Sequence, residues 1–183
     1  MLNEIQHIQE TAQLLHTERQ VEAALDTMAR QINIALADKN PLVLCVMNGG
    51  IVVAGKLLPR LTMSLTLDAI NASRYQNKTV GQTIAWVVKP STTLKDRTVL
   101  IVDDILDAGI TLKAIYDYCF EQGATAVYSA VLVNKLLDHE KPITADFIGL
   151  DVENHYVFGY GMDYKGYLRN AAGIYAAQQA QSL

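Results

Sequence analysis

VLIVDDILDAGITL, residues 99–112, is where a buried strand of this chain leads into an acidic turn and then a helix. The first four residues are aliphatic on both faces, which is typical of a central strand in a parallel sheet. Two carboxylates, Asp103 and Asp104, interrupt the apolar run, and Asp107 follows within one turn. From Thr111 onward, apolar residues recur at helical spacing, at positions 112, 115, 116, 119 and 120. The segment therefore predicts a strand, an acidic turn and a helix N-terminus.

This arrangement favours binding of a phosphorylated sugar. A helix N-terminus offers free N–H groups and the positive end of the helix dipole to a phosphate. Gly109 lets the backbone approach an anion, and Thr111 adds a hydroxyl donor. Three carboxylates would repel a phosphate unless they bind sugar hydroxyls or a divalent cation. Helix capping, the plainer explanation, accounts for one of the three acids.

The segment resembles the phosphoribosyl-pyrophosphate (PRPP) signature of type I phosphoribosyltransferases. That signature is an apolar strand, two acidic residues, two apolar residues, Asp, a small residue, Gly, any residue and Thr. The resemblance implies an α/β fold with a mainly parallel central sheet flanked by helices, and a small hood over the base site. It implies Mg²⁺ as cofactor and a PRPP site made by Asp103, Asp104, Asp107, Ala108, Gly109, Ile110 and Thr111.

A second apolar strand, 42–47, ends in Asn48 and two glycines. The residues alone allow an ordinary strand-to-helix turn or a second anion loop at the carboxyl end of a neighbouring strand. The resemblance implies a pyrophosphate site at Met47, Asn48 and Gly49, completed by Arg169. The family often has Lys where this chain has Asn48, so the loop would act through its backbone. A cis peptide bond between Met47 and Asn48 is left open.

Lys135 comes just after the apolar strand 127–133. From the residues alone, a solvent-facing lysine at a strand end is the preferred interpretation. The resemblance to the 6-oxopurine branch of the family implies instead that Lys135 donates to the purine O6. It also implies that Tyr156 stacks on the purine and that main-chain groups of Val157 reach the base edge. Asp163 would contact the base through its main chain and bear on Mg²⁺, giving the metal set Asp103, Asp104 and Asp163.

Two strands, 66–73 and 82–89, enclose a polar segment. This segment is either a hairpin connection or a lid that excludes water from the reacting sugar. The resemblance of Ser73, Arg74 and Tyr75 to the start of the family's catalytic loop favours the lid. Arg74 would add positive charge over the pyrophosphate.

The remaining segments predict one domain over residues 1–183. We expect a short helix over 2–15, and a longer one that Thr17 and Gln20 open as a capping box and Pro41 stops. The last sheet segments are expected at 145–150 and 155–164, and a short helix in the tail 171–183. The domain then consists of N-terminal helices (1–40), a core of sheet and helices (42–135) and a base-binding segment with hood and tail (136–183).

Composition argues against several classes of protein, although a local basic patch is left open. The net charge of −4 argues against general nucleic-acid binding, and no apolar run approaches the ~20 residues that span a membrane. Cys45 and Cys119 lie in apolar patterns, which indicates buried thiols in a reducing, cytoplasmic compartment. The resemblance adds a homo-oligomer, a dimer or a tetramer.

The activity that the resemblance implies is purine salvage: transfer of the phosphoribosyl group from PRPP to hypoxanthine or guanine, giving IMP or GMP and pyrophosphate. Asp107 would be the general base and acid at the purine. One alternative is a regulatory protein of the same fold that binds PRPP or a nucleotide. A receiver-type signalling domain is disfavoured, because its acidic pair should follow the first strand. The ranking of hypoxanthine, guanine and xanthine stays open.

Overall fold

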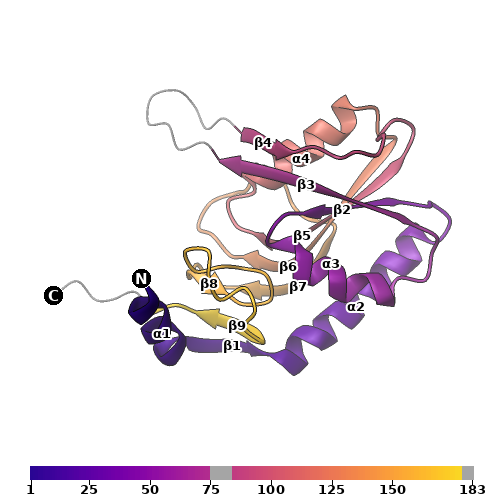
Figure 1. Ribbon diagram of the computed structural model, residues 1–183. Coiled ribbons are helices and arrows are strands. Elements are labelled where there is room, and N and C mark those ends of the chain that lie inside the picture. Colours follow the sequence, from indigo (N-terminus) through magenta and orange to yellow (C-terminus); the bar gives the residue numbers. More distant parts are fainter. Residues whose placement is uncertain (75–83, 179–183) are drawn as a thin grey trace.

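A six-stranded sheet forms the centre of the computed structural model, which describes residues 1–74 and 84–178 (Figure 1). The strand order is β4-β3-β2-β5-β6-β7, and every neighbouring pair is parallel except β3 with β4. The α/β fold with a mainly parallel sheet is therefore confirmed. The strands are β2 (Leu42–Val46), β3 (Thr66–Arg74), β4 (Ile84–Val88), β5 (Thr98–Leu106), β6 (Ala126–Lys135) and β7 (Phe147–Val152).

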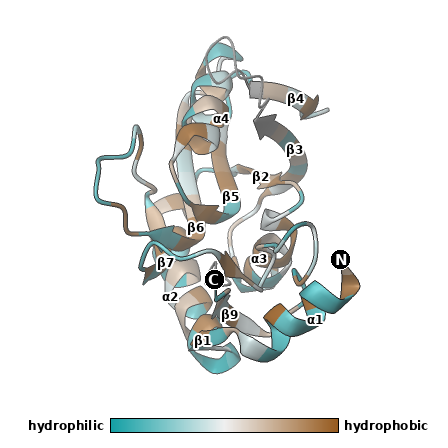
Figure 2. Cartoon of the chain, turned by 90° about the vertical axis from the view of Figure 1, so that its left-hand side faces the viewer, coloured by the Kyte–Doolittle hydropathy of each residue, from teal (hydrophilic) through white to brown (hydrophobic). Residues whose placement is uncertain are grey.

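Helices cover both faces of this sheet, because its central strands are apolar on both sides. Along β2, Val43 and Cys45 join the core cluster that contains α2 (Glu18–Leu36) and α3 (Gly50–Leu57). The alternate residues, Leu42 and Leu44, join the cluster that contains α4 (Ile110–Glu121). In Figure 2 the hydrophobic colouring runs along β5 and β6, while α1 (Leu2–Thr11) has hydrophilic and hydrophobic sides. A short 3-10 helix, η1 (Leu58–Arg60), follows α3.

The capping box that opens α2 is confirmed. The backbone N–H of Thr17 donates to Oε1 of Gln20 at 2.8 Å, and the N–H of Gln20 donates back to Oγ1 of Thr17. Helix α4 ends before Gln122, and Gly123 follows at a φ of 87°, a conformation that glycine adopts readily at helix C-termini. Among the described residues, none of the helices has both the length and the hydropathy that a bilayer crossing requires.

A second sheet, β1-β9-β8, makes the hood and lies below the main sheet in Figure 1. It is antiparallel and consists of β1 (Gln13–Thr17), β8 (Val157–Phe158) and β9 (Gly173–Ala176). Two predictions were therefore wrong: the first helix ends at Thr11 rather than continuing to 15, and the tail forms a strand where a helix was expected. Both errors have one cause, since β1 and β9 pair with each other across most of the chain and local periodicity does not reveal such a pairing.

The acidic pair lies inside β5 and does not end it. Asp103 is paired in register with Val131 of β6, and Ile105 with Val133. The sequence pattern predicted that the strand gives way to a turn at the acidic pair, and this prediction was wrong. Parallel pairing with β6 supplies backbone partners beyond the apolar run, so the strand continues to Leu106. The following helix begins at Ile110, after Gly109 at a φ of 78°.

Candidate active site

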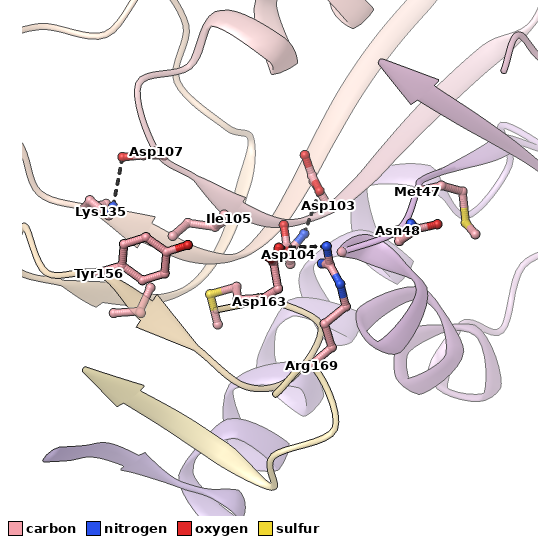
Figure 3. Close-up of a pocket in the computed structure, with 13 residues that line it drawn as sticks. Met47, Asn48, Asp103, Asp104, Ile105, Asp107, Lys135, Tyr156, Asp163 and Arg169 are labelled. Atoms are coloured by element: carbon pink, nitrogen blue, oxygen red, sulfur yellow. Dashed lines mark hydrogen bonds and ion pairs between the residues drawn. The ribbon is translucent and has the colours of Figure 1, made fainter. Parts of the chain in front are cut away.

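A cavity of about 390 Å³ opens where the carboxyl ends of β2, β5 and β6 face the hood. In Figure 3, Lys135, Asp107 and Tyr156 lie at one end of it, and Asn48 and Arg169 lie toward the other. The acidic pair of β5 lies between the two ends. The cavity is lined by Met47, Asn48, Gly49, Asp103, Asp104, Ile105, Asp107, Lys135, Tyr156, Val157, Met162, Asp163 and Arg169.

The two carboxylates of β5 are buried, each with 8% of its surface exposed. The N–H of Asp104 donates to Oδ1 of Asp103 at 2.9 Å. Burial raises the pKa of both carboxyls, and the neighbouring charge of Asp104 raises the pKa of Asp103 further. The pair therefore suits ligands that stabilise carboxylates, such as hydroxyl donors or a cation.

The loop after β2 reaches this pair through glycines. A Cβ atom on Gly49 would overlap the carboxylate of Asp104, and a Cβ on Gly161 of the hood would overlap the carbonyl oxygen of Gly49. Gly161 also has a φ of 105°, which side chains rarely adopt. The peptide bond between Met47 and Asn48 is cis. Backbone, acidic pair and hood thus meet without intervening side chains.

Lys135 and Asp107 form an ion pair at one end of the cavity. Nζ of Lys135 lies 3.1 Å from Oδ1 of Asp107 (Figure 3). The lysine side chain is 12% exposed and the aspartate side chain 44%. The ammonium is therefore shielded, whereas the carboxylate is open to a ligand.

The hood contributes a second ion pair. Arg169 binds Oδ1 of Asp163 through Nη2 at 2.7 Å and donates from Nη1 to the carbonyl of Gly161 at 2.6 Å. The positive charge of Arg169 also acts on Asp104, where it favours the charged carboxylate. The ring of Tyr156 packs edge-on against Tyr164 with 5.2 Å between centroids. These contacts hold the hood side of the cavity in shape.

A smaller cavity of about 230 Å³ adjoins the turn between β5 and α4 and shares the acidic pair and Asp107 with the larger one. Its lining includes Gly109 and Thr111, the two residues that the sequence analysis predicts to contact a phosphate. Within the described part of the chain, Ala108 and Ile110 line neither of these two cavities.

Most predicted site residues are thus brought together, with some exceptions. Ser73 and Arg74 end β3, their side chains are not described, and Tyr75 lies outside the described residues. The sequence interpretation missed Ile105 and Met162, which line the main cavity. Strand alternation from Asp103 would have found Ile105, since every second residue of a strand faces the same side.

Comparison with known proteins shows which proteins the chain resembles in sequence and fold. Residues 11–165 match the phosphoribosyl transferase domain family. Hypoxanthine-guanine phosphoribosyltransferase of Streptococcus pneumoniae is 30% identical over 158 residues, which cover 86% of this chain and 88% of that protein. A crystal structure of a hypoxanthine-guanine phosphoribosyltransferase from Bacillus anthracis is 25% identical, with a TM-score of 0.83 over 91% of this chain and 98% of that one.

A longer relative is the bifunctional protein TilS/HprT of Listeria innocua, which is 31% identical over 171 residues. The match covers 93% of this chain, which spans only about a quarter (26%) of that protein. The family match extends over most of the chain, and the relative in Streptococcus pneumoniae is matched over most of its own length. The chain therefore belongs to the phosphoribosyltransferase family, in the group of the hypoxanthine-guanine phosphoribosyltransferases.

Proposed function

We propose that this chain transfers the 5-phosphoribosyl group from PRPP to hypoxanthine or guanine, giving IMP or GMP and pyrophosphate in purine salvage. The observation that carries the proposal is the order of groups along one cavity. A fixed ammonium and an aromatic ring lie at one end, a carboxylate pair lies in the middle, and the backbone loop 47–49 with an arginine lies at the other end. That order matches a purine, a ribose and a pyrophosphate placed in line.

The ribose and its 5-phosphate are proposed to bind at β5 and the turn after it. Asp103 and Asp104 would accept hydrogen bonds from ribose hydroxyls. The turn 107–111 would hold the 5-phosphate, because it combines Gly109, the Thr111 hydroxyl and the first N–H groups of α4. The pyrophosphate would lie on the backbone of residues 47–49 and against Arg169.

Mg²⁺ fits the donor set of this cavity. It is usually bound by one or two protein carboxylates together with water and substrate phosphates. Among the described residues, no cluster of three or more His, Cys, Asp or Glu side chains is arranged as a metal site. We therefore propose that one or two carboxylates of the set Asp103, Asp104 and Asp163 hold the ion jointly with oxygens of PRPP. Bound there, Mg²⁺ would neutralise charge on the departing pyrophosphate.

The base is proposed to bind between Lys135 and Tyr156. The Lys135 ammonium would donate to the 6-oxo group, and the half-exposed ring of Tyr156 would stack on the purine. The main chain of Val157 and Asp163 would complete the base edge. A single buried donor of this kind rejects a 6-amino base, because the amino group offers no acceptor and the Lys135 ammonium would stay unpaired.

Asp107 is proposed to handle the proton of the reaction. As purine N9 bonds to ribose C1 and pyrophosphate leaves, the purine loses the proton of its imidazole ring. The Asp107 carboxylate would accept this proton at N7 and return it in the reverse reaction. Arg169 would stabilise the charge that develops on the leaving pyrophosphate.

The proposal extends to features outside the cavity. Residues 73–75 would begin a lid over the reacting sugar, and residues 1–183 would act as one domain. Cys45 and Cys119 are free and buried, which fits a reducing, cytoplasmic compartment. We propose that the chain forms a homo-oligomer, either a dimer or a tetramer. Light scattering would measure its molar mass in solution.

The deciding experiment is incubation of the protein with PRPP, Mg²⁺ and separate purine and pyrimidine bases, followed by chromatography of nucleotides. The expected products are IMP from hypoxanthine and GMP from guanine. Binding of PRPP without formation of any nucleotide would contradict the proposal and favour a regulatory protein of the same fold.

A further inference from the structure

Lys141 joins the ends of two strands that carry cavity residues. It lies in the loop between β6 and β7, and its Nζ donates to the carbonyl oxygen of Leu106 at 2.7 Å. The same Nζ donates to Oδ1 of Asn134 at 2.8 Å. Leu106 and Asn134 are register partners at the carboxyl ends of β5 and β6. One ammonium group therefore closes the open end of this strand pair.

The two residues that Lys141 holds each precede a cavity side chain. Leu106 is followed by Asp107, and Asn134 is followed by Lys135. The backbone at the end of each strand sets the direction in which the next side chain points. Lys141 holds the Leu106 carbonyl and the Asn134 side chain, and it thereby constrains the strand ends that carry the ion pair of Lys135 and Asp107 at 3.1 Å.

Much of the loop that carries Lys141 borders a cavity. A cavity of about 490 Å³ lies against it, lined in part by Leu136, Lys141, Ile143 and Ile148. Farther along, the loop is anchored by Asp146, whose Oδ2 accepts hydrogen bonds from the N–H and Oγ of Ser129. Within the cavity-lining part, the two hydrogen bonds of Lys141 tie the loop to the strand ends.

The same loop also reaches the phosphate turn. A Cβ atom placed on Gly109 would lie 3.2 Å from Cδ of Pro142 and 3.4 Å from Cβ of Lys141. Burial lowers the pKa of Lys141, while the charges of Asp107 and Asp151 oppose this change and that of Lys135 adds to it. The ammonium is thus partly withdrawn from water and has two hydrogen-bond acceptors, a setting in which charge-assisted hydrogen bonds are strong.

We infer that Lys141 is a positioning residue, which holds Asp107 and Lys135 in the relative geometry that the purine requires. This inference rests on the proposed function, because it takes these two side chains as the groups that meet the base. Lys141 itself would touch neither the base nor PRPP. A surface lysine that merely stabilises its loop is the alternative, and it predicts changes in stability without changes in the kinetics of the folded enzyme.

The test compares Lys141→Met, which keeps an unbranched stem but removes the donors, with Lys141→Arg, which keeps charge and donors. The matched control is Lys39→Met, an exposed lysine between α2 and β2 at the opposite, amino end of the sheet. For Lys141→Met we expect the KM for hypoxanthine to rise at least fivefold and kcat/KM to fall at least tenfold. The thermal shift produced by PRPP with Mg²⁺ should change less than twofold. Lys141→Arg should recover most of the loss, and Lys39→Met should match wild type.

Amide hydrogen exchange supplies a readout that needs no activity. In Lys141→Met, amides of residues 105–108 should exchange at least tenfold faster, while those of α2 stay as in wild type. Asn134→Ala, which removes one of the two acceptors, should show a smaller change of the same kind. If Lys141→Met does not fold, Asn134→Ala carries the test. Unchanged exchange at 105–108, or unchanged KM and kcat in an active enzyme, would overturn the inference. A wild-type protein that forms no nucleotide would instead sink the proposed function, and the exchange result would still decide the role of Lys141.

Discussion

The ammonium of Lys135 is paired with the carboxylate of Asp107 at 3.1 Å, although the two side chains come from different strand ends. The proposed reaction gives them different tasks, one at the purine O6 and one at N7. The O6 and N7 atoms lie on the same edge of a purine. A base that inserts between the two partners can therefore meet Lys135 with O6 and Asp107 with N7. The ion pair therefore keeps both groups oriented before the base binds.

Lys135→Ala tests the base end of this arrangement. We expect the KM for hypoxanthine and guanine to rise at least tenfold, while the KM for PRPP changes less than threefold, because Lys135 lines the main cavity but not the smaller cavity at the phosphate turn. The wild-type enzyme should turn over neither adenine nor orotate at a comparable rate. Steady-state kinetics with each substrate varied in turn provide the measurement. Equal changes in both KM values would mean that Lys135 does not touch the base.

PRPP with Mg²⁺ should stabilise the protein before any base is present. A ligand that binds only the folded state stabilises it by RT ln(1 + [L]/Kd), about 2.7 kcal/mol at one hundred times Kd. The variant with Asp103→Asn and Asp104→Asn should lose most of this rise in Tm. Thermal melts with and without ligand give the result, and Lys39→Met again serves as control. A full shift in the double variant would move the ribose site elsewhere in the chain.

The acidic pair should also make stability depend on pH. Burial raises the pKa of Asp103 above 3.8 in the folded state, so between 3.8 and the folded pKa the folded protein binds more protons than the unfolded chain. Stability from this group is complete below pH 3.8 and is lost as the pH rises through the folded pKa. Asp103→Asn carries no charge, and its amide oxygen can still accept the N–H of Asp104. Relative to wild type, the variant should gain up to about 1.4 kcal/mol of unfolding free energy per pH unit in that window.

Urea unfolding at several pH values between 4 and 8 measures this gain. The same variant should bind PRPP poorly, so that stability and function change in opposite directions. A constant difference between variant and wild type across the pH range would mean that Asp103 titrates normally in the folded protein.

Two glycines of the hood separate steric fit from backbone strain. Gly161 and Gly166 have φ values of 105° and 86°, but a Cβ would overlap the Gly49 carbonyl only at Gly161 and would lie in open space at Gly166. Gly166→Ala should lose about 1–2 kcal/mol of unfolding free energy, from the left-handed conformation alone. Gly161→Ala should lose clearly more and should also weaken PRPP binding, because the loop 47–49 must move. Comparable losses in both variants would contradict a close contact between hood and loop.

The main sheet could be predicted because its signals are local. Apolar runs mark β2, β5 and β6, and the turn residues after them stand next to those runs in the sequence. The strand at Gln13–Thr17 could not be predicted in the same way, because its partner is Gly173–Ala176 at the other end of the chain. The acidic pair likewise belongs to a strand because β5 pairs with β6 at these positions, and the apolar pattern of β5 does not reveal that pairing.

The cavity residues, too, could be predicted where the signal was local and not where it depended on the fold. Residues of the phosphate signature and Lys135, the last residue of β6, were found because each follows a recognisable apolar run. Met162 was missed, since a methionine between glycine and aspartate reads as ordinary hood packing. Lys141 gave no signal either, because a lysine in a polar loop is usually solvated, and only the fold brings it to the carbonyl of Leu106.

Asp107→Asn tests the proposed proton transfer. Asn is nearly isosteric with Asp and can still accept a hydrogen bond from Lys135 through its amide oxygen, so the variant should fold with an unchanged Tm and keep its PRPP-induced thermal shift. It cannot accept a proton at neutral pH. A positioned general base contributes typically ~10²–10⁴ in rate, so kcat should fall by at least about a hundredfold, equivalent to about 2.7 kcal/mol of activation free energy.

Asp117→Asn, which removes an exposed carboxylate paired with Lys113 on α4, is the matched control and should keep full activity. If Asp107 merely capped the following helix, Asn would replace it about equally well and kcat would stay near the wild-type value. Single-turnover measurements with PRPP already bound separate these outcomes, because they report the chemical step without product release.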